Sequence, residues 1–300
     1  MSLKHEPDYS AILESLKRRH EEKYGLAILD LRVEREGGEF LLRGRALLSK
    51  QVEEARELLS RAAGRSVKSE AVILADPASR AEEGWGMAKS EILDVWRTPP
   101  PLWEGESPER NRSTQLTPQD NPFRLLFKWE DWRLIQADDL TLGWAVERDI
   151  SPSPDGRERW AGLRRAAEGE AIEVDSTCLG EILAVARNYE GTPYLWGGAT
   201  RKGVDCSALT QRIYREACGV LLPRHSDDQR RVGERVPFGN WQPGDIMVFR
   251  LTEKSVLHVA LCLGEGKAIH ASRRQGKVIV ESISELLERY ALISVRRILA

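Results

Sequence analysis

The sequence has no strong excess of either charge. Its 45 lysine and arginine residues are balanced by 47 aspartate and glutamate residues, which leaves a formal net charge of −2. A chain this close to neutral has no overall electrostatic attraction to nucleic acid or to an anionic membrane surface. It also lacks any apolar run near the roughly 18 residues that a membrane-spanning helix requires. We therefore expect no nucleic-acid partner and no membrane span.

Cysteine is scarce, and the chain contains only Cys178, Cys206, Cys218 and Cys262. No two of them have the CxxC spacing of a structural zinc site, and a chain of this length builds a core without disulfides. We expect at least one free thiol. For Cys178, Cys218 and Cys262 we expect the role of small buried apolar side chains. Neither a metal nor an organic cofactor is expected.

The first residues lack the apolar stretch of a secretory signal peptide, because residues 1–7 are polar. This absence favours a cytoplasmic location. The alternative is a periplasmic or extracellular protein from which a leader has been removed.

What the chain does have is a globular balance of 41% hydrophobic and 31% charged residues. Residues 1–80 predict a module with the order α-β-β-α-β. Its predicted elements are a helix over 8–25, strands over 29–33 and 39–46 around Gly37-Gly38, a helix over 51–63 and a strand over 71–74. This order resembles a BON-like domain. Because the segment carries no concentrated polar cluster, we expect a packing or docking module.

Residues 85–150 are predicted to be all β. Short alternating segments occur over 90–96, 123–127, 132–136 and 143–146. Together with the Thr114-Gln115 pair and the closing Gly143-Trp144, this pattern resembles a bacterial SH3-like barrel.

The tryptophans of this segment have two interpretations. Trp129, Trp132 and Trp144 form either a recognition surface or the core of a small barrel, and we favour the core. Residues 151–175 begin with Ser-Pro-Ser-Pro-Asp-Gly and are predicted to be a connector.

Residues 176–300 contain the residues suited to catalysis. A glycine-bearing loop over 197–203 leads to Cys206, and apolar residues at Leu209, Ile213 and Ala217 predict that a helix begins at this cysteine. At a helix N-terminus the macrodipole and the unpaired N–H groups favour a thiolate, which is the nucleophilic form. Cys206 is therefore the candidate nucleophile.

A nucleophilic cysteine needs a base, and two histidines are available. Strands over 256–263 and 267–272 are joined by Gly264-Glu265-Gly266, which we interpret as a three-residue hairpin loop. In that register His258 and His270 lie on one face as diagonal neighbours. His270 would then orient His258, as the third member of a catalytic triad does. A zinc site is the competing use of these residues, but no fourth ligand is evident.

These residues belong to short motifs that occur in the order of the NlpC-type papain-like peptidases. The motifs are Gly191-Thr-Pro-Tyr-Leu-Trp-Gly-Gly198, Gly203-Val-Asp-Cys-Ser207, Leu222-Pro-Arg224, Gln242-Pro-Gly-Asp245, His258-Val-Ala260 and Ile269-His-Ala271. The chain resembles this family over about residues 177–295. The family comprises bacterial cell-wall γ-D-glutamyl-diamino-acid endopeptidases with a papain-like α+β fold, and its members often carry upstream SH3-like modules.

The resemblance implies a role for each matching residue. Cys206 would be the nucleophile, His258 the general base and acid, and His270 the orienting residue. In members that act on free murein peptides the aspartate before the cysteine binds the terminal amine, which here is Asp205. Three further residues are implied to face the substrate cleft: Ser207, Tyr194 and Ser226.

Two features qualify this comparison. Asp205 has a competing interpretation, because aspartate is also a favoured N-cap for the helix that begins at Cys206. Ala208 stands where the family usually has glycine, and we expect its methyl group to fit while tightening the packing beside the nucleophile.

We therefore expect an α+β chain with a papain-like cysteine peptidase domain over 176–300, preceded by an SH3-like β-barrel and an N-terminal α/β module. The expected reaction is hydrolysis of the γ-D-Glu-diamino acid bond of murein peptides that carry a free N-terminal L-Ala, as in peptidoglycan recycling. The alternatives are an exported cell-wall endopeptidase and a papain-like amidase or acyltransferase. A non-catalytic binding module is disfavoured, because it would not need Cys206, His258 and His270 together.

Overall fold

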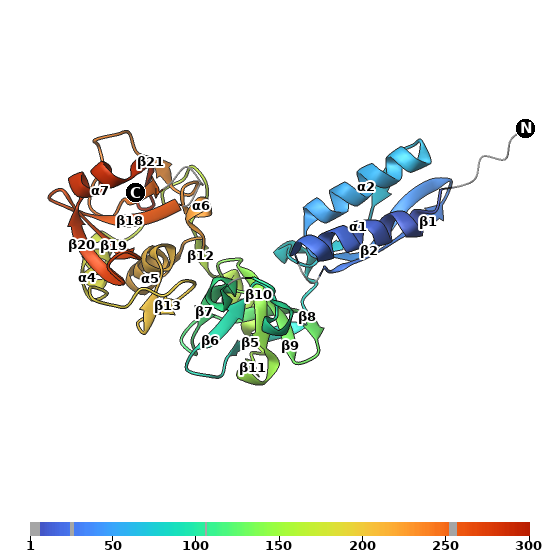
Figure 1. Cartoon of the computed structure of the whole chain (residues 1–300), viewed down its shortest axis with the longest axis horizontal. Coiled ribbons are helices and arrows are strands. Elements are labelled where there is room, and N and C mark those ends of the chain that lie inside the picture. The colour runs from blue at the N-terminus through green and yellow to red at the C-terminus, as the bar shows by residue number, and fades with distance from the viewer. Residues whose placement is uncertain (1–6, 25–26, 106, 252–256) are drawn as a thin grey trace, which may run out of the picture.

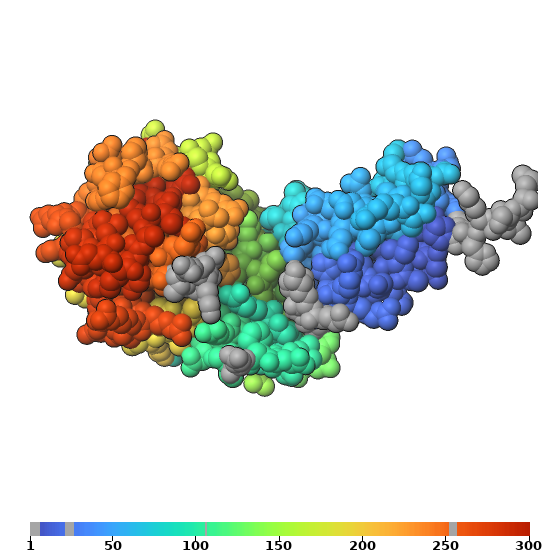
Figure 2. All heavy atoms as spheres, turned by 45° about the horizontal axis from the view of Figure 1, so that its top comes forward, coloured from blue at the N-terminus to red at the C-terminus, as the bar shows by residue number. Residues whose placement is uncertain are grey.

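The structure is a computed structural model that describes residues 7–24, 27–105, 107–251 and 257–300. Its three larger sheets have four, seven and six strands and follow one another along the chain. Figure 1 shows the corresponding N-terminal, middle and C-terminal parts in blue, green and yellow to red, with the middle part between the other two. In the space-filling view the middle part contacts both neighbours (Figure 2). None of the described helices is both long and apolar enough to cross a membrane.

The N-terminal part packs two helices on a four-stranded sheet. Its elements are α1 (Tyr9–Tyr24), β1 (Leu29–Glu36), β2 (Glu39–Ala46), α2 (Ser49–Ala63), β3 (Val67–Ser69) and β4 (Val72–Ile73). The predicted element order is confirmed, and β3 is an additional short strand. Gly37 and Gly38 both have positive φ and form the tight turn between β1 and β2, as the pair predicted. The likeness to a BON-like domain stays a prediction.

The middle part is an antiparallel sheet in the order β11-β5-β8-β9-β10-β6-β7. Its strands are β5 (Gly84–Ala88), β6 (Leu93–Trp96), β7 (Arg112–Leu116), β8 (Phe123–Trp129), β9 (Trp132–Gln136), β10 (Leu142–Val146) and β11 (Ile150–Pro152). Short 3₁₀ turns occur at η1 (Pro77–Ser79), η2 (Pro100–Leu102), η3 (Pro108–Asn111) and η4 (Glu147–Asp149). The predicted β character is confirmed, and the SH3-like classification stays a prediction.

The middle-part tryptophans pack inward. Trp144 is 4% exposed and packs in one cluster with Ile28 and Leu74 of the preceding part. Trp129 and Trp132 are partly buried against the same cluster. Trp144 is therefore buried as predicted, but in a cluster that joins the N-terminal and middle parts and not in the separate core of the middle sheet, which contains Val95, Phe123 and Ile135.

The expected connector is more ordered than its Pro/Gly/Ser content indicates. Residues 150–152 add β11 to the middle sheet. The helix α3 (Gly156–Ala161) then places the buried Trp160 edge-to-face on Trp85, with ring centroids 4.8 Å apart. The strand β12 (Arg164–Arg165) pairs with β15 (Val220–Leu221) of the C-terminal part. The apolar Trp160 and the strand pairings before and after it fix the segment.

The C-terminal part wraps helices around a sheet in the order β16-β21-β17-β18-β19-β20. Its helices are α4 (Cys178–Arg187), α5 (Cys206–Cys218), α6 (Ser226–Gln229) and α7 (Ile283–Arg289). Its remaining strands are β13 (Ala199–Thr200), β14 (Gly203–Val204), β16 (Glu234–Arg235), β17 (Ile246–Arg250), β18 (Leu257–Gly264), β19 (Lys267–Ser272), β20 (Lys277–Ser282) and β21 (Ala291–Arg297). Helix α5 contacts β18 and β19, and its Leu209 and Ile213 share a fully buried core with Val259 and Ile269. This packing brings the start of α5 to the histidine-bearing strands.

Two of the four cysteines differ from the sequence expectation. Cys178 on α4 and Cys218 at the end of α5 form a disulfide, with their Cα atoms 5.8 Å apart. We expected both to act as small buried apolar side chains, and this disulfide was not predicted. The pairing follows from the antiparallel contact of α4 and α5, which sequence spacing does not reveal. Cys206 and Cys262 are free, and Cys262 is buried as expected.

Candidate active site

Cys206 is the first residue of α5, as the sequence predicts. The preceding Asp205 caps the helix, because its Oδ1 accepts a hydrogen bond of 2.8 Å from the N–H of Ala208. The approach loop requires glycine at 197: its φ is +69°, and a Cβ there would lie 2.5 Å from the carbonyl oxygen of Arg112 in the middle part. Ala208 is fully buried, so its methyl group is accommodated in the core beside the nucleophile.

The two histidines face each other across β18 and β19. His258 Nε2 and His270 Nδ1 are 2.9 Å apart, and the ring planes are nearly perpendicular. The prediction that both rings share one face is therefore confirmed. The expected loop is wrong in detail, because Gly264 pairs with Lys267 and leaves a two-residue turn. A bulge at Leu263 then shifts the pairing by one residue, which restores the predicted register at Leu261 and Ile269.

Glu281 on β20 extends this chain of polar groups, and the sequence interpretation missed it. Its Oε2 lies 3.2 Å from His270 Nε2 and also contacts Arg289 on α7. His270 pairs with Ile279, so Glu281, two residues further along β20, lies on the same face. The available signal was a lone carboxylate in an otherwise apolar strand, Val278-Ile-Val-Glu281.

This hydrogen-bond chain fixes the tautomers. The Glu281 carboxylate only accepts, so His270 donates from Nε2 and is left with an accepting Nδ1. His258 must therefore donate from Nε2 to His270 and keep an unprotonated Nδ1. That nitrogen is the one available to take a proton from a thiol.

Cys206 and His258 line one cleft of about 290 Å³ between the middle and C-terminal parts. The residues implied by the sequence resemblance also line it: Asp205, Ser207, Tyr194 and Ser226. His225 lines the same cleft. His270 lies behind His258, only 2% exposed. Among the described residues no cluster of three or more histidines, cysteines and carboxylates is suited to hold a metal ion.

Burial keeps the nucleophile and its base uncharged. Desolvation, with a smaller contribution from the Asp205 carboxylate, raises the pKa of the Cys206 thiol to about 12. Backbone hydrogen bonds at Val259 and Ser207 act in the opposite direction. Burial, followed by the neighbouring His270, lowers the pKa of His258 to about 3. Desolvation and the Asp205 carboxylate therefore oppose the thiolate that the helix N-terminus favours.

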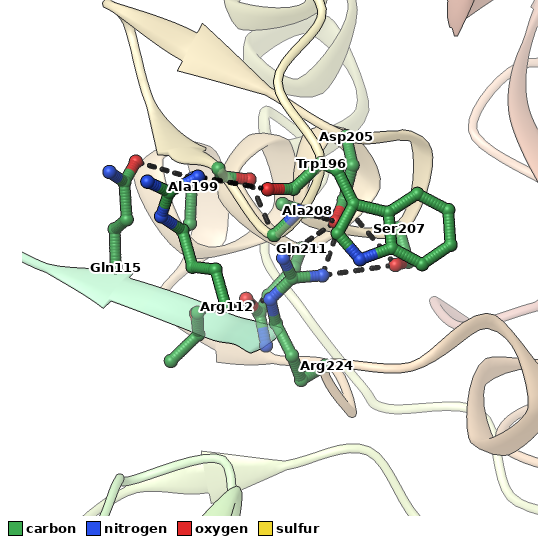
Figure 3. Close-up of polar contacts among 12 residues, drawn as sticks. Arg112, Gln115, Trp196, Ala199, Asp205, Ser207, Ala208, Gln211 and Arg224 are labelled. Atoms are coloured by element: carbon green, nitrogen blue, oxygen red, sulfur yellow. Dashed lines mark hydrogen bonds and ion pairs between the residues drawn. The ribbon is translucent and has the colours of Figure 1, made fainter. Parts of the chain in front are cut away.

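Asp205 already has a cationic partner, Arg224. The two form a two-pronged ion pair with contacts of 2.9 and 2.7 Å, and the Arg224 side chain is 1% exposed (Figure 3). With the N–H groups of Gly197 and Ala208 and the Ser207 hydroxyl, the Asp205 carboxylate accepts five hydrogen bonds. A carboxylate has about four lone-pair positions. The capping role of Asp205 is therefore observed directly, and its role in binding an amine stays a prediction.

Residues of the middle part contact the site, and Figure 3 shows Arg112 and Gln115 beside the loop that carries Trp196 and Ala199. Arg224 donates from Nε to the Thr114 hydroxyl at 3.0 Å. The Gln115 side-chain carbonyl accepts from the Ala199 N–H at 3.2 Å. Buried ion pairs of Asp120 with Arg212 and of Asp138 with Arg215 hold α5 itself. The Thr114-Gln115 pair, predicted only as part of a barrel, thus contacts Arg224 and the glycine-bearing loop before Cys206.

Comparison with known proteins identifies the C-terminal part. Residues 191–297 match the NlpC/P60 family. The chain is 36% identical over 140 residues to gamma-DL-glutamyl hydrolase of Bacillus subtilis (strain 168), covering 46% of this chain and 33% of that protein. It is 35% identical over 113 residues to murein DD-endopeptidase MepS/murein LD-carboxypeptidase of Escherichia coli (strain K12), covering 38% and 59%.

A shorter relative is matched over most of its length. A probable endopeptidase of Haemophilus influenzae is 34% identical over 124 residues, which cover 39% of this chain and 76% of that protein. The chain spans only a third to about three fifths of the other two relatives. The matched region contains the cysteine, both histidines and the motifs around them. The chain therefore belongs to the NlpC/P60 family of cysteine peptidases.

Proposed function

We propose that this protein hydrolyses the γ-D-glutamyl–diamino acid bond of murein peptides, with Cys206 as the nucleophile. The observation that carries the proposal is the chain from His258 through His270 to Glu281 beside a cleft lined by Cys206. The names of two relatives support the substrate class, since one acts on γ-glutamyl bonds and the other on murein.

The proposed reaction begins from the neutral pair. His258 Nδ1 takes the proton from the Cys206 thiol as Sγ attacks the γ-carbonyl carbon. The N–H groups at the start of α5 stabilise the oxyanion that forms. His258 then donates that proton to the leaving amine of the diamino acid, and a thioester remains. Water attacks the thioester with His258 again as base, and the proton returns to Cys206 when the free γ-carboxylate leaves.

His270 and Glu281 act through His258 in this scheme. The hydrogen bond from His258 Nε2 to His270 prevents the ring from turning and keeps Nδ1 unprotonated. When His258 becomes charged, the Glu281 carboxylate behind His270 stabilises the positive charge. Both are positioning residues.

The test is incubation with defined murein tripeptides and tetrapeptides, each free or N-acetylated, followed by mass analysis. We expect L-Ala-γ-D-Glu or its acetylated form as the acyl product, and no turnover by Cys206→Ala. Added amine acceptors separate hydrolysis from acyl transfer, because a transferase would form the amide product in preference to the acid. Absence of cleavage of every peptide would overturn the proposal.

The disulfide bears on the location of the protein. Disulfides persist in oxidising compartments and are rare in the cytosol. The Cys178–Cys218 pair therefore favours the alternative of an exported protein over the expected cytoplasmic one. Alkylation of the protein in native cells, with and without prior reduction, tests this. Labelling of Cys178 without reduction would instead support the cytoplasmic location.

A further inference from the structure

The cleft beside Cys206 has an imbalance of charge. Four arginines line it: Arg97, Arg112, Arg224 and Arg273. Of the described residues that line it, Asp205 is the one carboxylate. Arg224 already pairs with Asp205, and Arg112 pairs with Asp94 outside the cleft at 2.8 Å. The two remaining arginines, Arg97 and Arg273, are the ones that lack a carboxylate.

Arg97 follows β6 of the middle part and is exposed. Within the described chain its guanidinium forms no ion pair or side-chain hydrogen bond. Partial burial and the positive charge of Arg224 lower the pKa of Arg97, whereas Asp205 raises it. Arg97 therefore lines the same cleft as the Asp205–Arg224 pair, with a positive charge that no carboxylate of the described residues neutralises.

Arg273 approaches the cleft from the other part of the molecule. It is the first residue after β19 and is exposed, and its guanidinium carbon lies 6.0 Å from the centroid of the Trp196 ring. It too forms no ion pair among the described residues. A guanidinium stacked on an aromatic ring keeps its N–H edge free for a planar anion. We refer to Arg97 and Arg273 together as the arginine rim.

The proposed substrate supplies such an anion. A γ-glutamyl linkage uses the side-chain carboxyl of D-Glu, so the α-carboxylate remains free close to the scissile bond. Arginine binds carboxylates by two parallel charge-assisted hydrogen bonds, which a carboxamide cannot form with the same charge. A diamino acid at the C-terminus of a short peptide supplies a second carboxylate of the same chemistry.

We propose that the arginine rim binds a carboxylate of the substrate and makes the enzyme selective for acidic over amidated murein peptides. This inference rests on the proposed function. It gives Arg97 of the middle part a direct role in substrate selection, in addition to the contacts that Thr114 and Gln115 of the same part make with Arg224 and Ala199.

The experiment uses a set of tripeptides L-Ala-γ-D-Glu-diamino acid. One has both α-carboxylates free, one is amidated at D-Glu, one is amidated at the diamino acid, and one is amidated at both. The full-length wild type is compared with Arg97→Gln and Arg273→Gln. Arg274→Gln is the matched control, because Arg274 is the exposed neighbour of Arg273 and does not line the described cleft.

We expect wild-type kcat/KM to fall ~tenfold or more on amidation of the carboxylate that the rim binds. The single amidation that lowers kcat/KM identifies whether the rim binds the carboxylate of D-Glu or that of the diamino acid. The ratio of kcat/KM for the acidic peptide to that for the amidated peptide should approach one in Arg97→Gln or Arg273→Gln. In Arg274→Gln it should stay as in the wild type. Equal cleavage of all four peptides by the wild type would overturn the arginine rim and leave the proposed function intact. Persistence of the preference in both rim variants would also overturn it.

A binding measurement separates this inference from the proposed function. Titration of the full-length Cys206→Ala protein with the acidic and the doubly amidated peptide needs no turnover. Tighter binding of the acidic peptide, lost when Arg97→Gln is added, supports the rim even if no peptide is cleaved. Equal affinity for both peptides, or no binding of the acidic one, would overturn it.

Discussion

The histidines and the arginines at the cleft differ in charge, burial and origin. His258 and His270 are 7% and 2% exposed, uncharged and satisfied by their own neighbours. The arginines that line the same cleft are charged, and Arg97 and Arg112 come from the middle part of the chain, whereas Arg224 and Arg273 come from the C-terminal part. The reacting groups are thus assembled within one part, while the surface that meets the substrate is shared between two. Reactivity and selectivity should therefore respond separately to mutation.

The largest effect should come from the reacting side. Cys206→Ala removes the nucleophile, so kcat should fall by ~10⁴-fold or more, as removal of a covalent nucleophile does in other hydrolases. Cys262→Ala is the matched control, because Cys262 is the other free thiol and is buried in the sheet core. It should retain activity with a modest loss of stability. Turnover by Cys206→Ala near the wild-type rate would contradict the mechanism.

A smaller effect on the same side should come from Glu281. Glu281→Gln offers His270 Nε2 either a donor or an acceptor, so the tautomer of His258 is no longer fixed. We expect kcat to fall roughly 10- to 100-fold, as for other residues that orient a catalytic ligand, with KM nearly unchanged. Glu288→Gln on the exposed side of α7 is the control. An unchanged kcat in Glu281→Gln would show that His270 orients His258 without help.

Substitution of Thr114 tests whether the middle part also affects reactivity. Thr114 lies in the middle part and accepts a hydrogen bond from Arg224 at the site. Thr114→Val leaves the buried Arg224 Nε–H without its acceptor, at a cost of about 1–3 kcal/mol. We expect a lower free energy of unfolding and a roughly tenfold loss of kcat/KM. Thr114→Ser keeps the hydroxyl and should restore both. Full activity of Thr114→Val would show that the hydrogen bond from Thr114 to Arg224 is not needed for catalysis.

The sequence predicted the catalytic residues better than the residues that we propose select the substrate, and the reason is physical. A helix start and the alternation of a strand are local, so Cys206, His258 and His270 follow from neighbouring residues. The predicted register of that hairpin is correct although the predicted loop is one residue too long, because a bulge at Leu263 compensates for the difference. Contacts between distant elements, such as that of Arg224 with Thr114, depend on packing that no local pattern records.

The pH dependence of kcat/KM at its acidic limb should be determined by His258. Because burial lowers the pKa of His258 to about 3, its ring stays able to accept a proton well below the usual histidine value of about 6.5. The acidic limb of kcat/KM should therefore lie below pH 6. Stability should change in the same range: below about pH 6.5 the unfolded chain binds a proton that the buried ring does not, so the free energy of unfolding falls with falling pH. An acidic limb at pH 6.5 or above would contradict a neutral, buried base.

The smallest effect we expect concerns the N-terminal amine of the substrate. A free L-Ala amine was predicted to pair with Asp205, yet that carboxylate already accepts five hydrogen bonds, two of them from Arg224. An ammonium would have to displace one of these donors and would approach the positive charges of Arg224 and Arg97. The gain should therefore stay below about 1.4 kcal/mol, so that N-acetylation changes wild-type kcat/KM by less than ~tenfold. Measuring free and acetylated tripeptides side by side checks this. A preference of tenfold or more for the free amine would restore Asp205 as the amine-binding residue and would favour recycling of free peptides over cleavage of intact wall.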